Sequence, residues 1–344
     1  MPHIKFFKDI SKKSVAEAGG KGASLGEMTR ANIPVPPGFV VLAGAFDRFI
    51  EETNLKQEIA ARLAEVNPAD TNSVDRASNI LRDVIHDTPM PADLTKEILT
   101  AFDELRAQSL DSRLRGNDSD YFVAVRSSAT AEDSAVASWA GELETYLNTT
   151  RENAVERVKQ CWSSLFTPRA IFYRHEKNLI DHYVSVAVVV QKMIQSEISG
   201  IAFTVHPVTE DYDQMIIEAG YGLGEAIVSG QITPDSYVVS KSEMSIVDIY
   251  VGAQTRKLVR AKVKAKSEKD KINKKDDDLA NEWVEIGAEG EKQKLTGKQI
   301  IEVAEVCKKI VEHYGFPCDI EWAMEGGKIY ITQSRPITTL KKKE

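Results

Sequence analysis

Residues 318–336 read CDIEWAMEGGKIYITQSRP and predict two β-strands joined by a Gly-Gly turn. The first strand carries Asp319 and Glu321, and the second carries Gln333 and Arg335. Carboxylate and amide oxygens are ligands that Mg²⁺ accepts in proteins, and the Arg guanidinium forms paired hydrogen bonds with phosphate oxygens. The hairpin therefore indicates a metal–nucleotide site, with Glu321 and Gln333 as candidate metal ligands.

The hairpin register decides whether these two residues can bind one metal. Side chains alternate between the two faces of a strand, so both must lie on the same face. A two-residue Gly326-Gly327 turn in a regular hairpin would pair Glu321 with Thr332 and turn Gln333 to the opposite face. A three-residue loop at 325–327, or a bulge, would bring the two side chains together. We therefore expect an odd-length loop or a bulge.

Length and charge limit the class of protein. A chain of 344 residues exceeds what one ordinary core holds, so at least two packed units are expected. The hydrophobic fraction of 42% occurs in scattered runs, which is typical of a globular protein in water. The net charge of −8 argues against a nucleic-acid binder, which usually carries a basic face.

Cysteine spacing and hydropathy indicate the compartment. Cys161, Cys307 and Cys318 form no CxxC pair, which argues for reduced thiols and against a zinc site or a disulfide framework. The N-terminal MPHIKFFKDISKK lacks the apolar core of a signal peptide, and no stretch approaches transmembrane length. We expect a cytoplasmic protein without a membrane partner.

Hydrophobic periodicity divides the chain into an N-terminal lobe, 1–183, and a C-terminal lobe, 184–344, in an α+β fold. The first lobe contains a helical unit followed by a polar loop insertion at 109–120. The second begins with the most apolar stretch, 184–193, predicted to be a central strand. Its charged segment, 254–298, is expected to be a solvated loop or hairpin. Further strands are expected at 4–10, 39–42, 121–126, 143–148, 201–205, 214–218 and 236–239, and helices at 19–31, 45–110, 151–179 and 296–314.

Two segments of the N-terminal lobe could bind phosphate. Gly19-Gly20-Lys21-Gly22 at a helix start offers backbone N–H groups and one Lys to an anion, although it lacks the Ser or Thr of a P-loop. Residues 126–133, RSSATAED, leave a buried strand as a loop that can fold over phosphates, with Arg126 as charge partner and Gly141 and Thr145 following. A surface Lys and an ordinary Ser/Thr-rich turn are the structural alternatives.

Two strand ends are candidates for contacts to the nucleoside. Gln191-Lys192-Met193 ends the most apolar strand, where backbone groups can bind an adenine edge and Met193 can pack on the ring. A core Met is the structural alternative. Glu218 ends another strand and could accept ribose hydroxyls. The glycine-rich run 218–225 lacks the GxGxxG spacing of a dinucleotide fold, and turn formation would explain its glycines equally well.

The order of these segments resembles the ATP-binding domain of the phosphoenolpyruvate synthase (pyruvate, water dikinase) and pyruvate phosphate dikinase family. The resemblance covers essentially the whole chain apart from 109–120 and 254–298. It implies an ATP-grasp fold of two lobes, with ATP and Mg²⁺ in the nucleotide cleft between them. The blocks that carry it are GGKGASLGEM, VPPGFVV, VAVRSSATAEDSAVASWAGELETYLN, VVVQKMI, GIAFTVHPVT, IIEAGYGLGEAIVSGQITPDSYVV and DIEWAM…IYITQSRP.

The resemblance also implies a role for each candidate residue. Phosphate contacts would come from both lobes, and metal ligands from the last hairpin. Asp319 would be a supporting or phosphate-side group. The implied roles are phosphate binding and catalysis by Lys21, Arg126 and Arg335, a closing loop with Gly141 and Thr145, adenine binding by Gln191 with Met193 nearby, a ribose contact by Glu218, and Mg²⁺ ligation by Glu321 and Gln333.

The resemblance implies a phosphotransferase that needs a second protein or domain. In the family, the β,γ-diphosphoryl group of ATP passes to a histidine on a separate swivelling domain, and AMP is formed. Hydrolysis then releases phosphate and leaves phosphohistidine, which phosphorylates pyruvate in a third domain. That histidine lies in a Thr-Ser-His type motif, and none of the six histidines here has this context. His206 is expected to be structural. Because nine residues follow Arg335, neither the histidine domain nor the pyruvate-binding barrel is expected within these 344 residues. The chain is expected to be a stand-alone ATP-binding subunit, a fragment, or a half-enzyme that needs a partner in trans.

Two other functions compete with this interpretation. A non-catalytic ATP-binding regulatory module would keep the fold but could lose the charges at the phosphate end. Retention of Lys21, Arg126, Glu321, Gln333 and Arg335 favours the phosphotransferase. An ATP-grasp ligase would share the fold, but the match to dikinase blocks outside the nucleotide pocket, such as ITPDSYVV, argues against it. The final acceptor, pyruvate or another, stays open.

Overall fold

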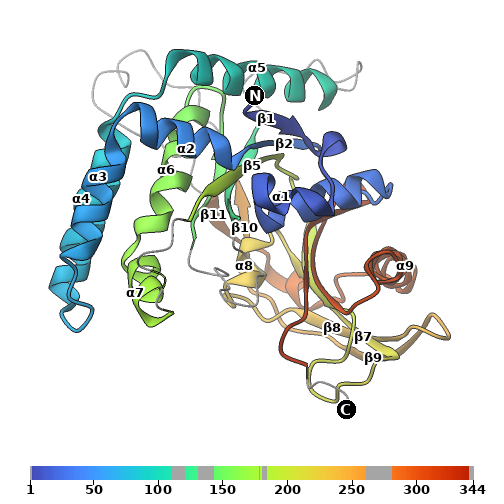
Figure 1. Ribbon diagram of the computed structural model, residues 1–344. Coiled ribbons are helices and arrows are strands. Elements are labelled where there is room, and N and C mark those ends of the chain that lie inside the picture. Colours follow the sequence, from blue (N-terminus) through green and yellow to red (C-terminus); the bar gives the residue numbers. More distant parts are fainter. Residues whose placement is uncertain are drawn as a thin grey trace, which may run out of the picture. The chain divides into compact units, whose positions relative to one another are not determined.

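The computed structural model describes residues 2–109, 121–130, 143–177, 179, 184–260 and 281–340. These residues form two compact units, which we call unit 1 and unit 2. Unit 1 comprises Met1–Arg30 and Pro37–Met193, and unit 2 comprises Ala31–Pro36 and Ile194–Glu344. Each unit combines helices with antiparallel strands (Figure 1), so the chain belongs to the mixed α/β class.

The sheet of unit 1 has five strands in the order β1-β2-β5-β3-β4, and every pair is antiparallel. Its centre is β5, the apolar strand predicted from 184–193, in which every residue except Lys192 is buried. A strand this apolar needs a neighbour along both edges, and it finds β2 and β3 in this sheet. The compact units therefore separate after Met193, and not at the expected position after residue 183. The bounds are β1 (Ile4–Phe6), β2 (Gly38–Val41), β3 (Val123–Ala129), β4 (Thr145–Thr149) and β5 (Val186–Lys192).

One face of this sheet packs on a hydrophobic core built with helices. Trp162 is fully buried there, with ring centroids 5.8 Å from Phe46 and 5.1 Å from Phe49. The helical pattern expected over 45–110 forms four helices, because Asn54 adopts a left-handed φ of 57° and prolines stand in the later connections. The helices are α2 (Ala43–Glu52), α3 (Leu55–Ala64), α4 (Thr71–Asp87), α5 (Ala92–Ser109), α6 (Ala154–Ser163) and α7 (Pro168–Glu176).

The opposite face of the same sheet carries α1 (Val15–Arg30). Gly22 makes this close packing possible, since a Cβ built on it would already lie 3.1 Å from Val40 Cγ2. Val40 points away from the helical core, whereas its neighbours Phe39 and Val41 belong to that core. Side chains of β3 and β5 that share the orientation of Val40 therefore lie on the α1 side of the sheet.

The sheet of unit 2 has six strands in the order β13-β12-β6-β7-β8-β9, again with antiparallel pairs only. Helix α9 (Gly297–Tyr314) packs on one face, where Gln299 Nε2 donates to Met324 Sδ over 3.4 Å. Ile320 and Trp322 alternate along β12 in the same orientation as Met324 and are buried. Asp319 and Glu321 alternate with these and point to the other face. The strands are β6 (Ile198–Phe203), β7 (Gln214–Tyr221), β8 (Asp235–Ser240), β9 (Ser245–Tyr250), β12 (Cys318–Glu325) and β13 (Lys328–Pro336).

The charged segment 254–298 contains a second, two-stranded sheet in unit 2. Strands β10 (Arg256–Arg260) and β11 (Asn281–Glu285) pair antiparallel near the short helix α8 (Glu225–Val228). The expected hairpin is present, but part of this segment is not solvated. Lys294 is fully buried because it forms an ion pair with Asp235. The lysine-rich composition of the segment had predicted exposure to solvent at this position.

All three cysteine thiols lie in the interior of the fold. Cys161, Cys307 and Cys318 are free and buried. Burial raises the pKa of Cys161 to about 12 and that of Cys318 to about 11, so both thiols are protonated at neutral pH. Among the described helices, none has an apolar stretch long enough to cross a membrane.

Candidate functional site

The β12–β13 hairpin solves the register problem with a bulge. Gly326 and Gly327 have φ values of 56° and 72°, and Glu325 pairs with Lys328, so the turn has two residues. The register then shifts by one residue at Thr332, and Glu321 lies opposite Gln333. The predicted bulge is confirmed, whereas the three-residue loop is wrong because two consecutive glycines already supply the left-handed turn.

The bulge places two polar pairs on the face of the unit 2 sheet opposite α9. Gln333 Nε2 donates to Glu321 Oε1 over 2.9 Å. Two register positions further along, Arg335 Nε and Nη2 lie 2.9 and 2.8 Å from Asp319 Oδ2. The Asp319 side chain is 15% exposed and the Arg335 side chain 46%, so the guanidinium is oriented and still accessible to solvent.

Glu218 lies on the same face, two strands away. Glu321 pairs with Ile201 on β6, and Ile201 pairs with Glu218 on β7, so the three residues form one cross-strand row. Two inter-strand steps separate the backbones of Glu321 and Glu218 by roughly 10 Å. Burial raises the pKa of Glu218, and the nearby Asp319 carboxylate raises it further. This face therefore presents carboxylates, an amide and a guanidinium together.

In unit 1, the glycine-rich run interrupts α1 and restarts it. Gly19 has φ 68° and fits only because it lacks a side chain: a Cβ would lie 2.2 Å from Ser128 Oγ. Ser128 Oγ donates to Ala18 O (2.9 Å) and accepts from Gly22 N (3.2 Å). Lys21 thus stands in the first turn of the restarted helix. The N–H of Gly22, one of the groups expected to bind an anion, already donates to Ser128 Oγ.

Arg126 and Thr145 are paired on neighbouring strands. They lie opposite each other on β3 and β4. Arg126 shares its orientation with Ser128, so it points to the side of the sheet on which α1 packs. Arg126 is half-buried and Thr145 exposed. Lys21, Arg126 and Thr145 are therefore presented on one side of unit 1. Gly141 lies outside the described residues.

The expected adenine contacts stand at the end of β5. Gln191 pairs with Ala124 on one edge and Gly38 on the other, and its side chain is almost fully buried. Met193 N donates to Phe122 O over 3.0 Å, and Met193 is half-buried. The backbone of β5 within the sheet is thus committed to its neighbours. The adenine role of Gln191 and Met193 stays a prediction.

The serines beside Arg126 are structural. Ser127 Oγ donates to Glu144 O over 3.0 Å and lies 3.0 Å from Ser164 Oγ. Ser127 and Ser128 are both buried, with hydroxyls bound to other parts of unit 1. Both hydroxyls are therefore engaged in hydrogen bonds within unit 1. Their role is to fasten β3 to α1 on one side and to the helical core on the other.

The glycines of 218–225 also serve packing. Gly222 has φ 94°, and a Cβ on it would lie 2.4 Å from Leu258 O. Leu223 N donates to the same carbonyl over 2.9 Å. A Cβ on Gly220 would lie 2.6 Å from Ile232 Cδ1. The structural alternative accounts for these two glycines: Gly222 lets β10 approach the end of β7, and Gly220 leaves room for Ile232.

Sequence reasoning did not find the residues that hold this segment in place. Gln254 forms hydrogen bonds with both backbone groups of Tyr221. The Lys294–Asp235 ion pair is linked to Gln254 through the carbonyl of Gly290, to which both Lys294 Nζ and Gln254 N donate. No short spacing joins these positions, and Gln254 and Lys294 stand in a charged run that is typical of surface. Asp235 stands in the block ITPDSYVV, which the family resemblance singled out, but that block does not identify its partners.

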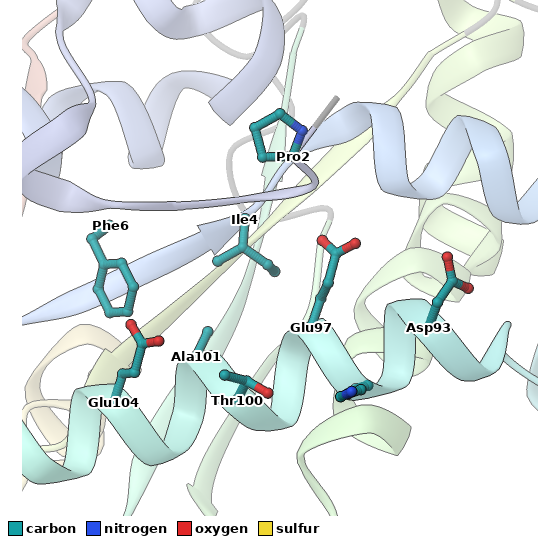
Figure 2. A pocket seen from close by; sticks show the side chains of 9 residues that line it. Pro2, Ile4, Phe6, Asp93, Glu97, Thr100, Ala101 and Glu104 are labelled. Atoms are coloured by element: carbon teal, nitrogen blue, oxygen red, sulfur yellow. The ribbon is translucent and has the colours of Figure 1, made fainter.

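A cavity of about 410 Å³ in unit 1 lies away from all predicted site residues. It is formed by β1 and α5, and Figure 2 shows Glu97, Glu104 and Asp93 on the α5 side with Ile4 and Phe6 facing them. Its lining holds three carboxylates, of Asp93, Glu97 and Glu104, against the single ammonium group of Lys96, and this charge balance disfavours phosphate. The cavity is therefore not the nucleotide site that the sequence predicts.

A Mg²⁺ ion at this site would take most of its ligands from the nucleotide phosphates and from water. The described part of the chain contains no group of three or more His, Cys, Asp or Glu residues that could hold a metal ion. Glu321 and Gln333 offer side-chain oxygens from neighbouring positions. Mg²⁺ in nucleotide enzymes is commonly bound by one or two carboxylates with phosphate oxygens and water completing the shell. The residues present fit that kind of Mg²⁺ site.

Comparison with known proteins adds independent findings. Residues 15–344 match the family model described as pyruvate phosphate dikinase, AMP/ATP-binding domain. The "Probable phosphoenolpyruvate synthase" of Methanocaldococcus jannaschii is 44% identical over 344 residues, which are 99% of this chain and 27% of that protein. The protein of the same name from Archaeoglobus fulgidus is 44% identical over 347 residues, 99% of this chain and 42% of its own.

A third relative and one solved structure are also similar to the chain. "Phosphoenolpyruvate synthase" of Pyrococcus furiosus is 39% identical over 373 residues, covering 98% of this chain and 44% of that protein. The chain thus spans less than half the length of these relatives. D-alanyl-alanine synthetase A from Vibrio cholerae aligns over 76% of this chain and 54% of its own, with 11% identity. Its TM-score of 0.28 is too low to support an argument about the fold.

Proposed function

Since the chain belongs to the pyruvate phosphate dikinase AMP/ATP-binding domain family, we propose that it binds Mg-ATP in an ATP-grasp fold and transfers phosphoryl groups. One nucleotide would be served by the residue sets of both units. Unit 2 would supply Glu321 and Gln333 to Mg²⁺, Arg335 to the terminal phosphates and Glu218 to the ribose. Unit 1 would supply Lys21 and Arg126 to the phosphates, Gln191 and Met193 to the adenine, and Thr145 with Gly141 to the segment that covers the phosphates.

The geometry of the β12–β13 hairpin is the observation that carries this proposal. A bulge at Thr332 sets Glu321 beside Gln333, and Asp319 holds the Arg335 guanidinium through two nitrogens before any nucleotide arrives. Rotation of the Gln333 amide about its last bond would present Oε1 in place of Nε2. Two oxygens would then stand side by side for a cation. Such preorganisation is what phosphoryl transfer requires of a protein.

The chemistry of the step needs little covalent work from these residues. Mg²⁺, when bound, would neutralise negative charge on the phosphate oxygens. Arg335, Lys21 and Arg126 would stabilise the charge that develops on the transferred group, and Arg335 can use a fork of parallel N–H groups because Asp319 fixes its plane. Glu218, on the same face as Glu321, would hold the ribose so that the phosphates reach these cations.

The proposed acceptor is a histidine on a partner, with pyruvate as one candidate for the final acceptor. The relatives carry more than half of their length outside the region matched here, so the histidine would come from a further domain or a separate protein. The β,γ-phosphoryl groups would pass from ATP to the imidazole nitrogen, with AMP as the leaving group. Hydrolysis would then release phosphate and leave phosphohistidine.

Nucleotide analysis tests the proposal. The protein is incubated with Mg-ATP and a candidate histidine-domain partner, and the products are separated. AMP together with acid-labile phosphate on the partner is the expected result. ATP binding without turnover would support the regulatory module instead. ADP as the sole product would refute the dikinase-type step, and absence of ATP binding would refute the whole proposal.

A further inference from the structure

A fully buried ion pair in unit 2 takes no part in the nucleotide contacts proposed above. Lys294 Nζ lies 2.8 Å from Asp235 Oδ1, and neither side chain is exposed at all. Removing two charges from water is costly, and a buried pair adds little net stability compared with apolar packing. Its presence therefore draws attention to the geometry that it fixes.

The pair joins the start of β8 to two backbone segments. Asp235 Oδ1 accepts from Gly252 N (3.0 Å), and Oδ2 accepts from Lys294 N (2.7 Å) and Tyr237 Oη (2.6 Å). Lys294 Nζ donates to Gly252 O and to Gly290 O, the latter over 3.0 Å. Both charged groups are thus surrounded by hydrogen-bond partners. The residues at 252 and 290 are held at fixed positions.

Gln254 extends this network to the end of β7. Gln254 N donates to Gly290 O over 3.0 Å. Its side chain accepts from Tyr221 N and donates to Tyr221 O, both over 2.9 Å, and also donates to Arg256 O over 3.0 Å. Gln254 is 3% exposed, so water does not replace these bonds easily. The amide closes a ring on the backbone of Tyr221, much as a neighbouring strand would.

Both ends of the network hold the strand segment that begins at Glu218. Asp235 pairs directly with Ala219, the next residue after Glu218, and Ser236 pairs with Glu218 itself. Tyr221, held by Gln254, follows Glu218 by three residues. A displacement of this segment would move the Glu218 carboxylate along its cross-strand row.

We propose that Gln254, anchored by the Asp235–Lys294 pair, is a positioning residue that fixes β7 at Glu218 and so sets how tightly the ribose of the nucleotide is held. The inference rests on the proposed function, in which Glu218 accepts ribose hydroxyls. It goes beyond that function because Gln254, Asp235 and Lys294 touch no part of the nucleotide there. Their effect passes through the backbone of β7.

The test compares ATP with 2′,3′-dideoxy-ATP, which lacks the hydroxyls that Glu218 would bind. Calorimetry gives the Kd of both nucleotides for the wild-type chain, Glu218→Gln and Gln254→Leu. We expect the wild type to prefer ATP by about tenfold, the effect of one hydrogen bond to a charged group. Both variants should lose most of this preference, with the dideoxy affinity nearly unchanged. General structural damage would lower both affinities together.

Further variants keep the test decisive. Gln293→Leu is the matched control, since Gln293 stands in the same segment but bonds to Leu295 O and not to β7. Gln254→Glu changes a single atom and removes both donors to the carbonyls, and Lys294→Met with Asp235→Asn removes the anchor. If the wild type binds no ATP, the proposed function fails. If the wild type discriminates and folded Gln254 variants keep its ratio, the positioning inference is overturned.

Discussion

Replacement of Arg335 by Met separates stability from nucleotide binding. The lost contacts are the two bonds to Asp319, of 2.9 and 2.8 Å, from a side chain that is 46% exposed. Exposed ion pairs contribute about 0.2–1 kcal/mol, so the free energy of unfolding should fall by less than about 1 kcal/mol. A hydrogen bond from a charged group to phosphate is worth about 1.5–3 kcal/mol, which raises the Kd for ATP roughly ten- to 150-fold.

The assay measures Kd by calorimetry with Mg-ATP and with AMP, and stability by urea unfolding. AMP lacks the terminal phosphates that Arg335 would contact, so its affinity for Arg335→Met should equal that of the wild type. Arg151→Met is the matched control. Arg151 forms the same kind of pair in unit 1, with Nε 2.6 Å from Asp103 Oδ1, and no predicted site residue takes part.

The control also defines the result that refutes the reasoning. If Arg151→Met weakens ATP binding as much as Arg335→Met does, the effect is not specific to the hairpin. If Arg335→Met leaves the Kd for ATP unchanged while the protein is folded, Arg335 does not contact the phosphates. A parallel loss of AMP affinity would place Arg335 near the nucleoside instead.

Three further predictions concern the bulge, Glu218 and Gly19. Deletion of Thr332, the extra residue of the bulge, keeps Glu321 opposite Gln333 and should preserve the ATP affinity measured by calorimetry. Deletion of Ser334 turns the Arg335 guanidinium to the α9 face and should abolish ATP binding. Equal losses of affinity in the two variants would contradict the register argument. Burial raises the pKa of Glu218 in the folded protein, so its charged form destabilises the fold at neutral pH. Glu218→Gln should therefore raise the free energy of urea unfolding at pH 7, and a gain that persists below about pH 4, where the folded and unfolded carboxyls are both protonated, would refute the burial argument. Gly19→Ala should cost about 2 kcal/mol more than Gly230→Ala in the same measurement, because both have φ near 68° but only Gly19 lacks room for a Cβ; similar losses would show that φ alone matters.

The sequence predicted those features that depend on short spacing. The alternation of Asp319, Glu321, Gln333 and Arg335 along two strands was enough to require either an odd-length loop or a bulge, because strand parity is a strict geometric condition. The apolar run of β5 identified a central strand, since few strands are buried along both edges and both faces. Local pattern and tertiary structure agree at these positions.

The rest depends on contacts that are distant in the chain. Ser128 donates to Ala18 O across 110 residues of sequence, a contact with α1 that no local pattern indicated. Lys294 joins Asp235, which lies 59 residues earlier, and its lysine-rich neighbourhood predicted solvent. The side chains of Ser and Lys are compatible with a ligand-binding role, with a position on the surface and with burial in a hydrogen-bond network. Only the partner decides among these, and sequence spacing does not identify that partner.

The segment Ala31–Pro36 belongs to unit 2 although unit 1 precedes and follows it, so the chain passes from one unit to the other three times. Pro34 O accepts from Ile331 N, a bond of 2.8 Å that supports the β13 strand carrying Gln333 and Arg335. A unit 2 expressed from Ile194 onward would lack this acceptor next to its predicted metal ligands. Cleavage after Met193 alone would not separate the two units, because the N-terminal product would still contain Ala31–Pro36, which belong to unit 2. The two units are thus inseparable by a single cut, and any engineered division must move six residues from the N-terminal part of the gene to the C-terminal part.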